Sequence, residues 1–105
     1  TTTIGQKFKL DAGTEIELVT GASSIVMKSD GSITIKGVNI TLDGSMKIAA
    51  KAGVNMDLGA GVSLKAHSDA QVEVAGGAMT TVKGPMLMLK ADAMAQMSGG
   101  IIMIG

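Results

Sequence analysis

The feature that most constrains the fold is a recurring pair of apolar residues separated by one residue. Successive pairs begin about eight residues apart, as from Ile25 to Ile33 and from Val54 to Val62, with some shorter intervals. Spacing of i and i+2 places both side chains on one face of a β-strand, and no helical periodicity competes with it. We therefore predict an all-β fold of short strands on a degenerate octad repeat. The side chains predicted to point inward are Ile16, Leu18, Ile25, Met27, Ile33, Ile35, Ile40, Leu42, Met46, Ile48, Val54, Met56, Val62, Leu64, Val72 and Val74.

The residues between the pairs agree with this pattern. Clusters such as Ser29-Asp30-Gly31 and Asp43-Gly44 are typical of tight corners, because Gly and Asp tolerate the backbone angles of turns. Charged residues fall on the opposite parity to the apolar pairs: Glu15 and Glu17 flank Ile16. Each strand is thus expected to have one dry face and one solvated face.

Composition indicates that the interior is thin and shared between chains. Hydrophobic residues make up 46% of the sequence, yet Phe8 is its one aromatic residue, so the bulk that usually dominates a compact core is missing. One such stripe buries too little apolar surface to offset the entropy lost on ordering the backbone, and it leaves strand edges unpaired. We expect a closed homotrimer in which three chains share one core.

Charge and residue content exclude several classes of protein. Nine basic and nine acidic residues cancel, so no net field favours nucleic acid or an anionic membrane surface. The absence of Cys excludes disulfides and thiolate sites, and no apolar run approaches the length of a membrane helix. No signal-peptide pattern is present, and the Thr-Thr-Thr start is interpreted as that of a fragment or processed piece.

Several segments resemble the C-terminal β-helix of VgrG proteins, the spike proteins of bacterial type VI secretion, which are similar to contractile phage tail needles. They are the runs 8–18, 21–27 and 30–44, and the ending 99–105 is similar to the tip of that family. The resemblance extends over residues 1–105 as a single spike segment. Regular octads cover 1–75, and a distal, less regular, Met-rich part covers 76–105, where Gly76-Gly77 and Gly84-Pro85 interrupt the pattern.

This resemblance implies an intertwined triple-stranded β-helix, a rigid trimeric β-prism, with a structural, membrane-piercing role. It also implies a partner, a PAAR-repeat protein that caps the tip for effector delivery, and a transient contact with the target-cell membrane. Such a spike is assembled in the bacterial cytoplasm and then secreted or injected by the contractile apparatus. Two other interpretations stay open: the central spike of a contractile phage tail, and a single-chain β-helix such as an ice-binding protein or acyltransferase scaffold.

No set of residues predicts an enzyme, and we assign no catalytic, cofactor-binding or metal-binding residue. His67 is the one histidine and falls on the outward parity, so we interpret it as a surface residue. The strongest functional candidate is the apolar end of the chain, because an exposed apolar patch usually marks an interaction site. The predicted partner-binding tip consists of Ile101, Ile102, Met103, Ile104 and Gly105.

Methionines are concentrated in the last third of the chain. Flexible thioethers fill irregular gaps in a core, and that is the interpretation we prefer. The alternative is a distal lumen that widens and holds an ion or a small apolar molecule. The residues concerned are Met79, Met86, Met88, Met94, Met97 and Met103.

Overall fold

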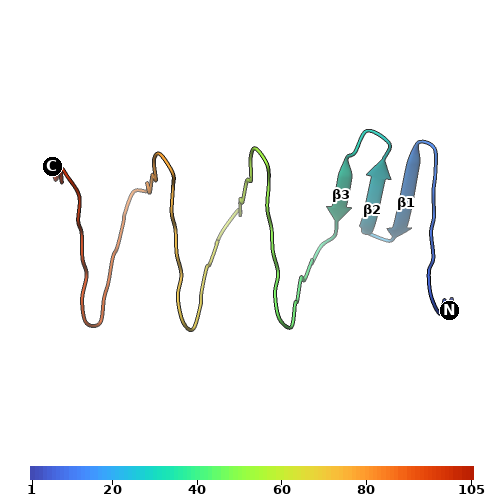
Figure 1. Cartoon of the computed structure of the whole chain (residues 1–105), viewed down its shortest axis with the longest axis horizontal. Helices are drawn as coiled ribbons and strands as arrows, with labels where there is room; N and C mark the ends of the chain where they lie inside the picture. The colour runs from blue at the N-terminus through green and yellow to red at the C-terminus, as the bar shows by residue number, and fades with distance from the viewer. The chain divides into compact units, whose positions relative to one another are not determined.

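Three consecutive strands form an antiparallel sheet in the N-terminal part of the chain (Figure 1). The computed structural model describes residues 1–105. Strand β1 spans Glu15–Thr20, β2 spans Ser23–Lys28 and β3 spans Ile33–Lys36, in the order β1-β2-β3. The chain has no helix. The prediction of an all-β protein is confirmed.

The turn between β1 and β2 depends on one glycine. Thr20 pairs with Ser23, which leaves Gly21 and Ala22 as a two-residue loop. Gly21 has a φ of 55°, in the left-handed region, whereas Ala22 does not. A positive φ at the first central residue is typical of a type II′ turn, whose twist matches that of the flanking strands.

The turn between β2 and β3 is one residue longer and is held by three hydrogen bonds. The amide of Gly31 donates to the carbonyl of Lys28 at 3.1 Å, and the amide of Lys28 donates to the carbonyl of Ser32 at 3.0 Å. Gly31 has a φ of 94°, as expected where a three-residue hairpin loop ends in a bulge. The amide of Ser32 donates to Oδ1 of Asp30 at 3.0 Å.

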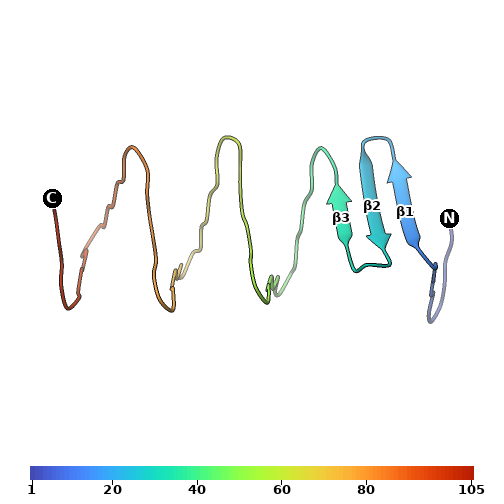
Figure 2. The same ribbon diagram turned by 90° about the horizontal axis from the view of Figure 1, so that it is seen from above.

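The strand register places apolar side chains together. Leu18 lies opposite Ile25, which in turn lies opposite Ile35. Directly paired residues of an antiparallel sheet share a face, so this row runs across all three strands. A second row, formed by Ile16, Met27 and Ile33, runs parallel to the first. Figure 2 shows the three strands side by side. We call the resulting surface the apolar sheet face; it consists of Ile16, Leu18, Ile25, Met27, Ile33 and Ile35.

The chain divides into two units, Thr1–Asp57 and Leu58–Gly105, and the sheet belongs to the first. The second unit contains neither helix nor strand. Every predicted inward residue beyond β3 lies outside a strand, because no second segment of the chain is hydrogen-bonded alongside it. These residues are Ile40, Leu42, Met46, Ile48, Val54, Met56, Val62, Leu64, Val72 and Val74.

Bends nevertheless recur along both units with a period close to eight. In the first unit a bend or turn begins at residues 5, 13, 21, 29, 38, 45 and 53, and in the second at 61, 69, 77, 85, 92 and 100. The apolar pairs do not show this regularity, because the interval between them varies from six residues (Ile40 to Met46) to ten (Val62 to Val72). Gly77 and Pro85 interrupt the apolar pattern, but both lie at bends of the series.

Two glycines are required where the backbone bends back on itself. A Cβ on Gly44 would come within 2.6 Å of the carbonyl oxygen of Lys47, and a Cβ on Gly76 within 2.5 Å of that of Met79. Real Cβ atoms do not approach a backbone oxygen so closely. Each glycine immediately precedes a bend, one in each unit. A side chain at either position would force the bend open.

No side chain of the single chain is buried. Ile16 and Val26 are half-buried, while large apolar residues remain exposed along both units. An apolar content of 46% without any core is unusual, because burial of apolar surface is the dominant favourable contribution to folding. The chain alone therefore lacks the burial that stabilises an ordinary domain.

Candidate interaction surfaces

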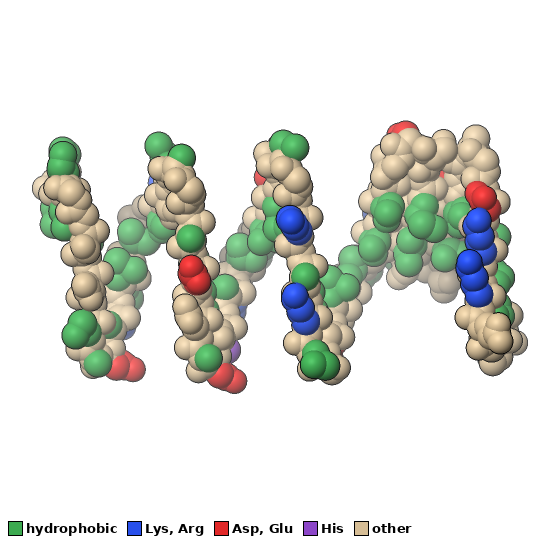
Figure 3. All heavy atoms as spheres, viewed as in Figure 1, with side chains coloured by type: hydrophobic (Ala, Val, Ile, Leu, Met, Phe, Trp, Pro, Cys, Tyr) green, Lys and Arg blue, Asp and Glu red, His purple; other side chains and the backbone are tan.

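The apolar sheet face is the best-defined surface of the first unit. Figure 3 shows hydrophobic side chains gathered over the strands. The two least exposed of its residues in β2 and β3 are Met27, which is 37% exposed, and Ile25, which is 40% exposed. Six large aliphatic side chains on one sheet face form the kind of patch that usually marks an interaction site.

The opposite face of the same sheet carries its charged side chains, together with Val19 and the half-buried Val26. Glu15 lies directly opposite Lys28, and opposite charges at such a position stabilise a strand pair. Glu17 and Lys36 fall on the same parity, so charge is confined to this face. The sheet therefore has one largely apolar face and one mixed face that carries all of its charges.

A groove adjoins the apolar sheet face where the chain leaves β3. Its volume is about 510 Å³, and Leu18, Ile25, Ile35 and Ile40 line it together with polar residues such as Ser24 and Asn39. Gly37 also lines the groove, and a Cβ there would make only an ordinary van der Waals contact with Ile40, at 3.5 Å. The groove thus continues the apolar face beyond the end of the sheet.

The predicted partner-binding tip is a second apolar surface, at the end of the second unit. The chain bends at Gly100 and then continues as Ile101, Ile102, Met103, Ile104 and Gly105 without a strand. Ile101, Met103 and Ile104 are 87–89% exposed, and Ile102 is 49% exposed. Four large apolar side chains in succession leave the end of the chain without a polar face.

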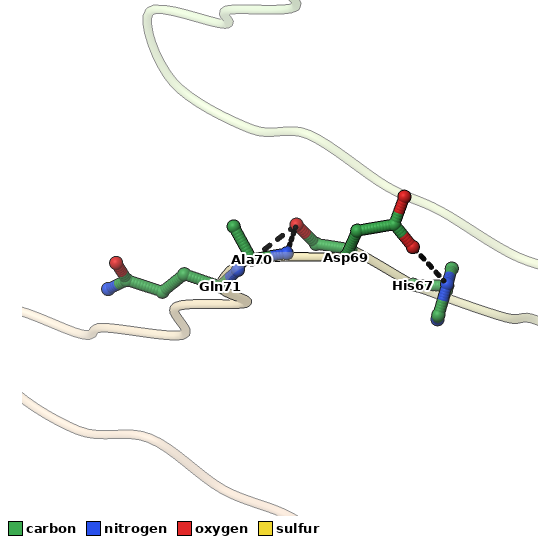
Figure 4. Close-up of polar contacts among 5 residues, drawn as sticks. His67, Asp69, Ala70 and Gln71 are labelled. Carbon is green, nitrogen blue, oxygen red and sulfur yellow. Dashed lines mark hydrogen bonds and ion pairs between the residues drawn. The ribbon is translucent and has the colours of Figure 1, made fainter.

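His67 lies on the surface of the second unit and is 85% exposed. Its Nε2 is 3.2 Å from Oδ1 of Asp69 (Figure 4). The hydroxyl of the intervening Ser68 accepts hydrogen bonds from the amides of Ala70 and Gln71 at 3.2 and 3.1 Å. The serine is thus bonded to backbone amides and not to the imidazole, so the three side chains do not form a nucleophile–base–orienter chain.

No other ion pair forms between the charged side chains, although Glu15 lies opposite Lys28 in the sheet. No group of three or more His, Asp or Glu side chains comes together in a way that could hold a metal ion. The pKa of Asp30 is lowered from its ordinary value of 3.8 because the amide and hydroxyl of Ser32 stabilise the carboxylate. No helix is available to cross a lipid bilayer.

Corners are predicted from the turn-forming clusters, but their regular spacing is not predicted. Small or turn-forming residues stand at positions separated by eight, starting from Gly5 and continuing through Gly13, Gly21, Gly53, Gly61 and Gly77. The apolar pairs give a less regular period, because their spacing varies from six to ten residues. Counting the glycines would have given the more regular repeat.

One comparison with known proteins gives a match. A stretch of 37 residues is 68% identical to the type VI secretion system spike protein VgrG1b of Pseudomonas aeruginosa. The match covers 35% of this chain and only 5% of that protein. The resemblance to VgrG spike proteins predicted from the sequence is confirmed over this stretch. No family model matches the chain, and no solved structure matches it significantly.

Proposed function

We propose that this chain is a structural segment of a type VI secretion spike and acts mechanically. The observation that carries the proposal is the 68% identity over 37 residues to a spike protein of that system. In this role the segment transmits the thrust of a contracting sheath and makes or breaks no covalent bond. It is assembled in the bacterial cytoplasm and leaves the cell with the spike.

Three copies of the chain are proposed to wind into an intertwined triple-stranded β-helix. Two features of the single chain support this assembly: it buries no side chain, and its sheet has one apolar and one charged face. The bends at intervals of eight supply corners between short strands in both units. Intertwined copies would cover the apolar faces and supply the strand partners that one chain lacks, which also removes exposed edges.

The oligomeric state tests this proposal. Sedimentation equilibrium of the purified chain is expected to give three times the 10.5 kDa mass of one chain. Far-ultraviolet circular dichroism should at the same time show more β-structure than three short strands provide. A monomer at micromolar concentration would contradict the proposed spike.

The tip Ile101–Gly105 is proposed to dock a PAAR-repeat protein. Three copies of four apolar residues would form an apolar plateau around the spike axis, and a plateau of this kind favours a protein cap over water. Replacing Met103 or Ile104 by Asp is expected to abolish binding of the PAAR protein in a pull-down while leaving the trimer intact.

The matched control is Ser98→Asp, which introduces the same charge just before the bend at Gly100. This variant should bind the PAAR protein as the unchanged chain does. Unaltered binding by Met103→Asp and Ile104→Asp would show that the cap is held elsewhere.

A further inference from the structure

The segment Met86–Leu89 carries four large apolar residues in succession and no charged or polar side chain. It consists of Met86, Leu87, Met88 and Leu89, all of them exposed in the single chain. No bend interrupts residues 86–91, which lie between the bends at Pro85 and Asp92 in the orange part of the chain in Figure 1. In β1, by contrast, Glu15 and Glu17 alternate with Ile16 and Leu18.

This difference has a consequence in any β-helix. Successive side chains of a strand point to opposite faces, so Met86 and Met88 share one face and Leu87 and Leu89 share the other. Only one of these pairs can point into the core. Whichever pair is inside, two large apolar side chains per chain stay outside, and three chains form an apolar belt around the assembly.

The charges around this segment are of one sign. Lys83 and Lys90 bracket the four apolar residues, and no acidic residue occurs between Glu73 and Asp92. The chain as a whole has no net charge, whereas this stretch is locally positive. Lysine stems cover apolar surface while the ammonium group reaches outward, as at a membrane interface.

We propose that residues 83–90 form a lateral contact site for an anionic lipid bilayer. The inference rests on the proposed trimeric spike and adds the part of it that touches lipid. The outward apolar pair inserts among the acyl chains near the headgroups, while Lys83 and Lys90 bind lipid phosphates. A bilayer fits better than an acidic protein, because the belt combines large flexible side chains with cations and offers no acceptor side chain between Lys83 and Lys90.

Flotation with vesicles tests the contact. The trimer is expected to float with vesicles of equimolar phosphatidylcholine and phosphatidylglycerol, and much less with phosphatidylcholine alone. Lys83→Gln/Lys90→Gln should weaken binding by roughly fivefold for each lysine removed from a chain. The matched control is Lys28→Gln/Lys36→Gln, which removes the same charge from the charged face of the sheet and should bind as the unchanged protein does.

Two double variants separate the faces of the belt. We expect one of Met86→Ser/Met88→Ser and Leu87→Ser/Leu89→Ser to remain a trimer and lose vesicle binding, and the other to weaken the trimer. Binding that survives in every variant that remains trimeric would overturn the proposal, and so would a loss of the trimer in both variants. Met103→Asp should still float, because the tip is a separate surface.

Failure of the lipid contact can be distinguished from failure of the proposed spike. If the chain sediments as a monomer, the spike proposal fails, and the lysine variants still decide whether residues 83–90 bind lipid. If the trimer forms but floats with neither vesicle, or equally with both, the lipid contact fails and the spike stands. Retention of an acidic protein by this belt without flotation would assign the surface to a protein and overturn the inference.

Discussion

Single glycines control the corners of this chain, and they do so for two different physical reasons. Gly21 and Gly31 take positive φ, which costs other L-residues about 1–2 kcal/mol. Gly44 and Gly76 have no such φ, but the backbone three residues on approaches too closely for a Cβ. A close approach of this kind cannot be recognised from the sequence, because Gly53 and Gly61 also stand at bends and yet have open space around them.

We predict that Gly76→Ala destabilises the assembled protein by about 1–3 kcal/mol, the usual cost of forcing extra atoms into a filled space. The added Cβ would collide with the carbonyl of Met79, so the bend must open. Thermal unfolding followed by circular dichroism measures the effect. Gly61→Ala is the control and should unfold within a degree or so of the unchanged protein; equal stability of the two variants would contradict the close approach.

The second prediction at this scale concerns Asp30. Hydrogen bonds from Ser32 favour its carboxylate, so the pKa of Asp30 lies below its ordinary value of 3.8. A lowered pKa in the folded state means that the turn is stabilised fully above the ordinary pKa. This stabilisation is lost as the pH falls below that value and through the folded pKa.

A carbon-13 NMR titration of the side-chain carboxyl measures the pKa of Asp30 directly. Ser32→Ala removes the hydroxyl hydrogen bond and keeps the amide, so it should raise the pKa of Asp30 only part of the way. A titration of Asp30 at or above 3.8 in the unchanged protein would refute the assigned hydrogen bonds.

At the scale of elements, the two faces of the sheet carry different kinds of side chain. Its turns fix the register, and the register places every large apolar side chain of the predicted pairs in β1–β3 on one face. A shift of one residue in either turn would move these side chains to the charged face. The apolar pairs of β2 and β3 start one residue further from the preceding bend than the pair of β1 does. All three pairs still share one face, because the two loops between the strands differ in length.

We predict that Ile35→Asp prevents association of the chains, whereas Thr34→Asp does not. Ile35 lies on the apolar sheet face and Thr34, its neighbour in β3, lies on the charged face. A carboxylate buried without a partner costs several kcal/mol, while one beside Lys36 stays in water. Sedimentation velocity of both variants gives the answer, and a trimer formed by Ile35→Asp would show that this face is not the interface.

At the scale of the whole molecule, the decisive property is the missing core. Each unit carries exposed aliphatic side chains, and neither buries one. In the proposed trimer the chain would gain its stability from the other copies, and that stability would depend on concentration, as in oligomers without a stable folded monomer.

We therefore predict that association and β-structure are lost together. On dilution or in increasing guanidinium, the sedimenting mass and the circular dichroism signal should fall in one coincident transition, and the midpoint should rise with protein concentration. A monomer that keeps the full β-signal after dissociation would contradict the shared core.

The sequence by itself determined the secondary-structure class, the approximate eight-residue period, the placement of the predicted apolar pairs of β1–β3 opposite the charged residues, and the likeness to VgrG spike proteins. These properties depend on local geometry and on residue identity, so they can be derived without knowing which segments meet. The apolar pairs beyond Lys36 show the limit of this reasoning. They have the pattern of strands, yet they form none in the single chain, because a strand needs a hydrogen-bonded partner.

Only the tertiary structure decided the strand register, the regular series of bends and the close approaches at Gly44 and Gly76. Register depends on how many residues each turn takes up, and Gly21-Ala22 and Ser29-Asp30-Gly31 take up different numbers. The close approaches depend on where a carbonyl three residues away comes to lie. The register and the close approaches both depend on distances between residues that are not adjacent in the sequence. The pattern of residue types along the chain does not specify these distances.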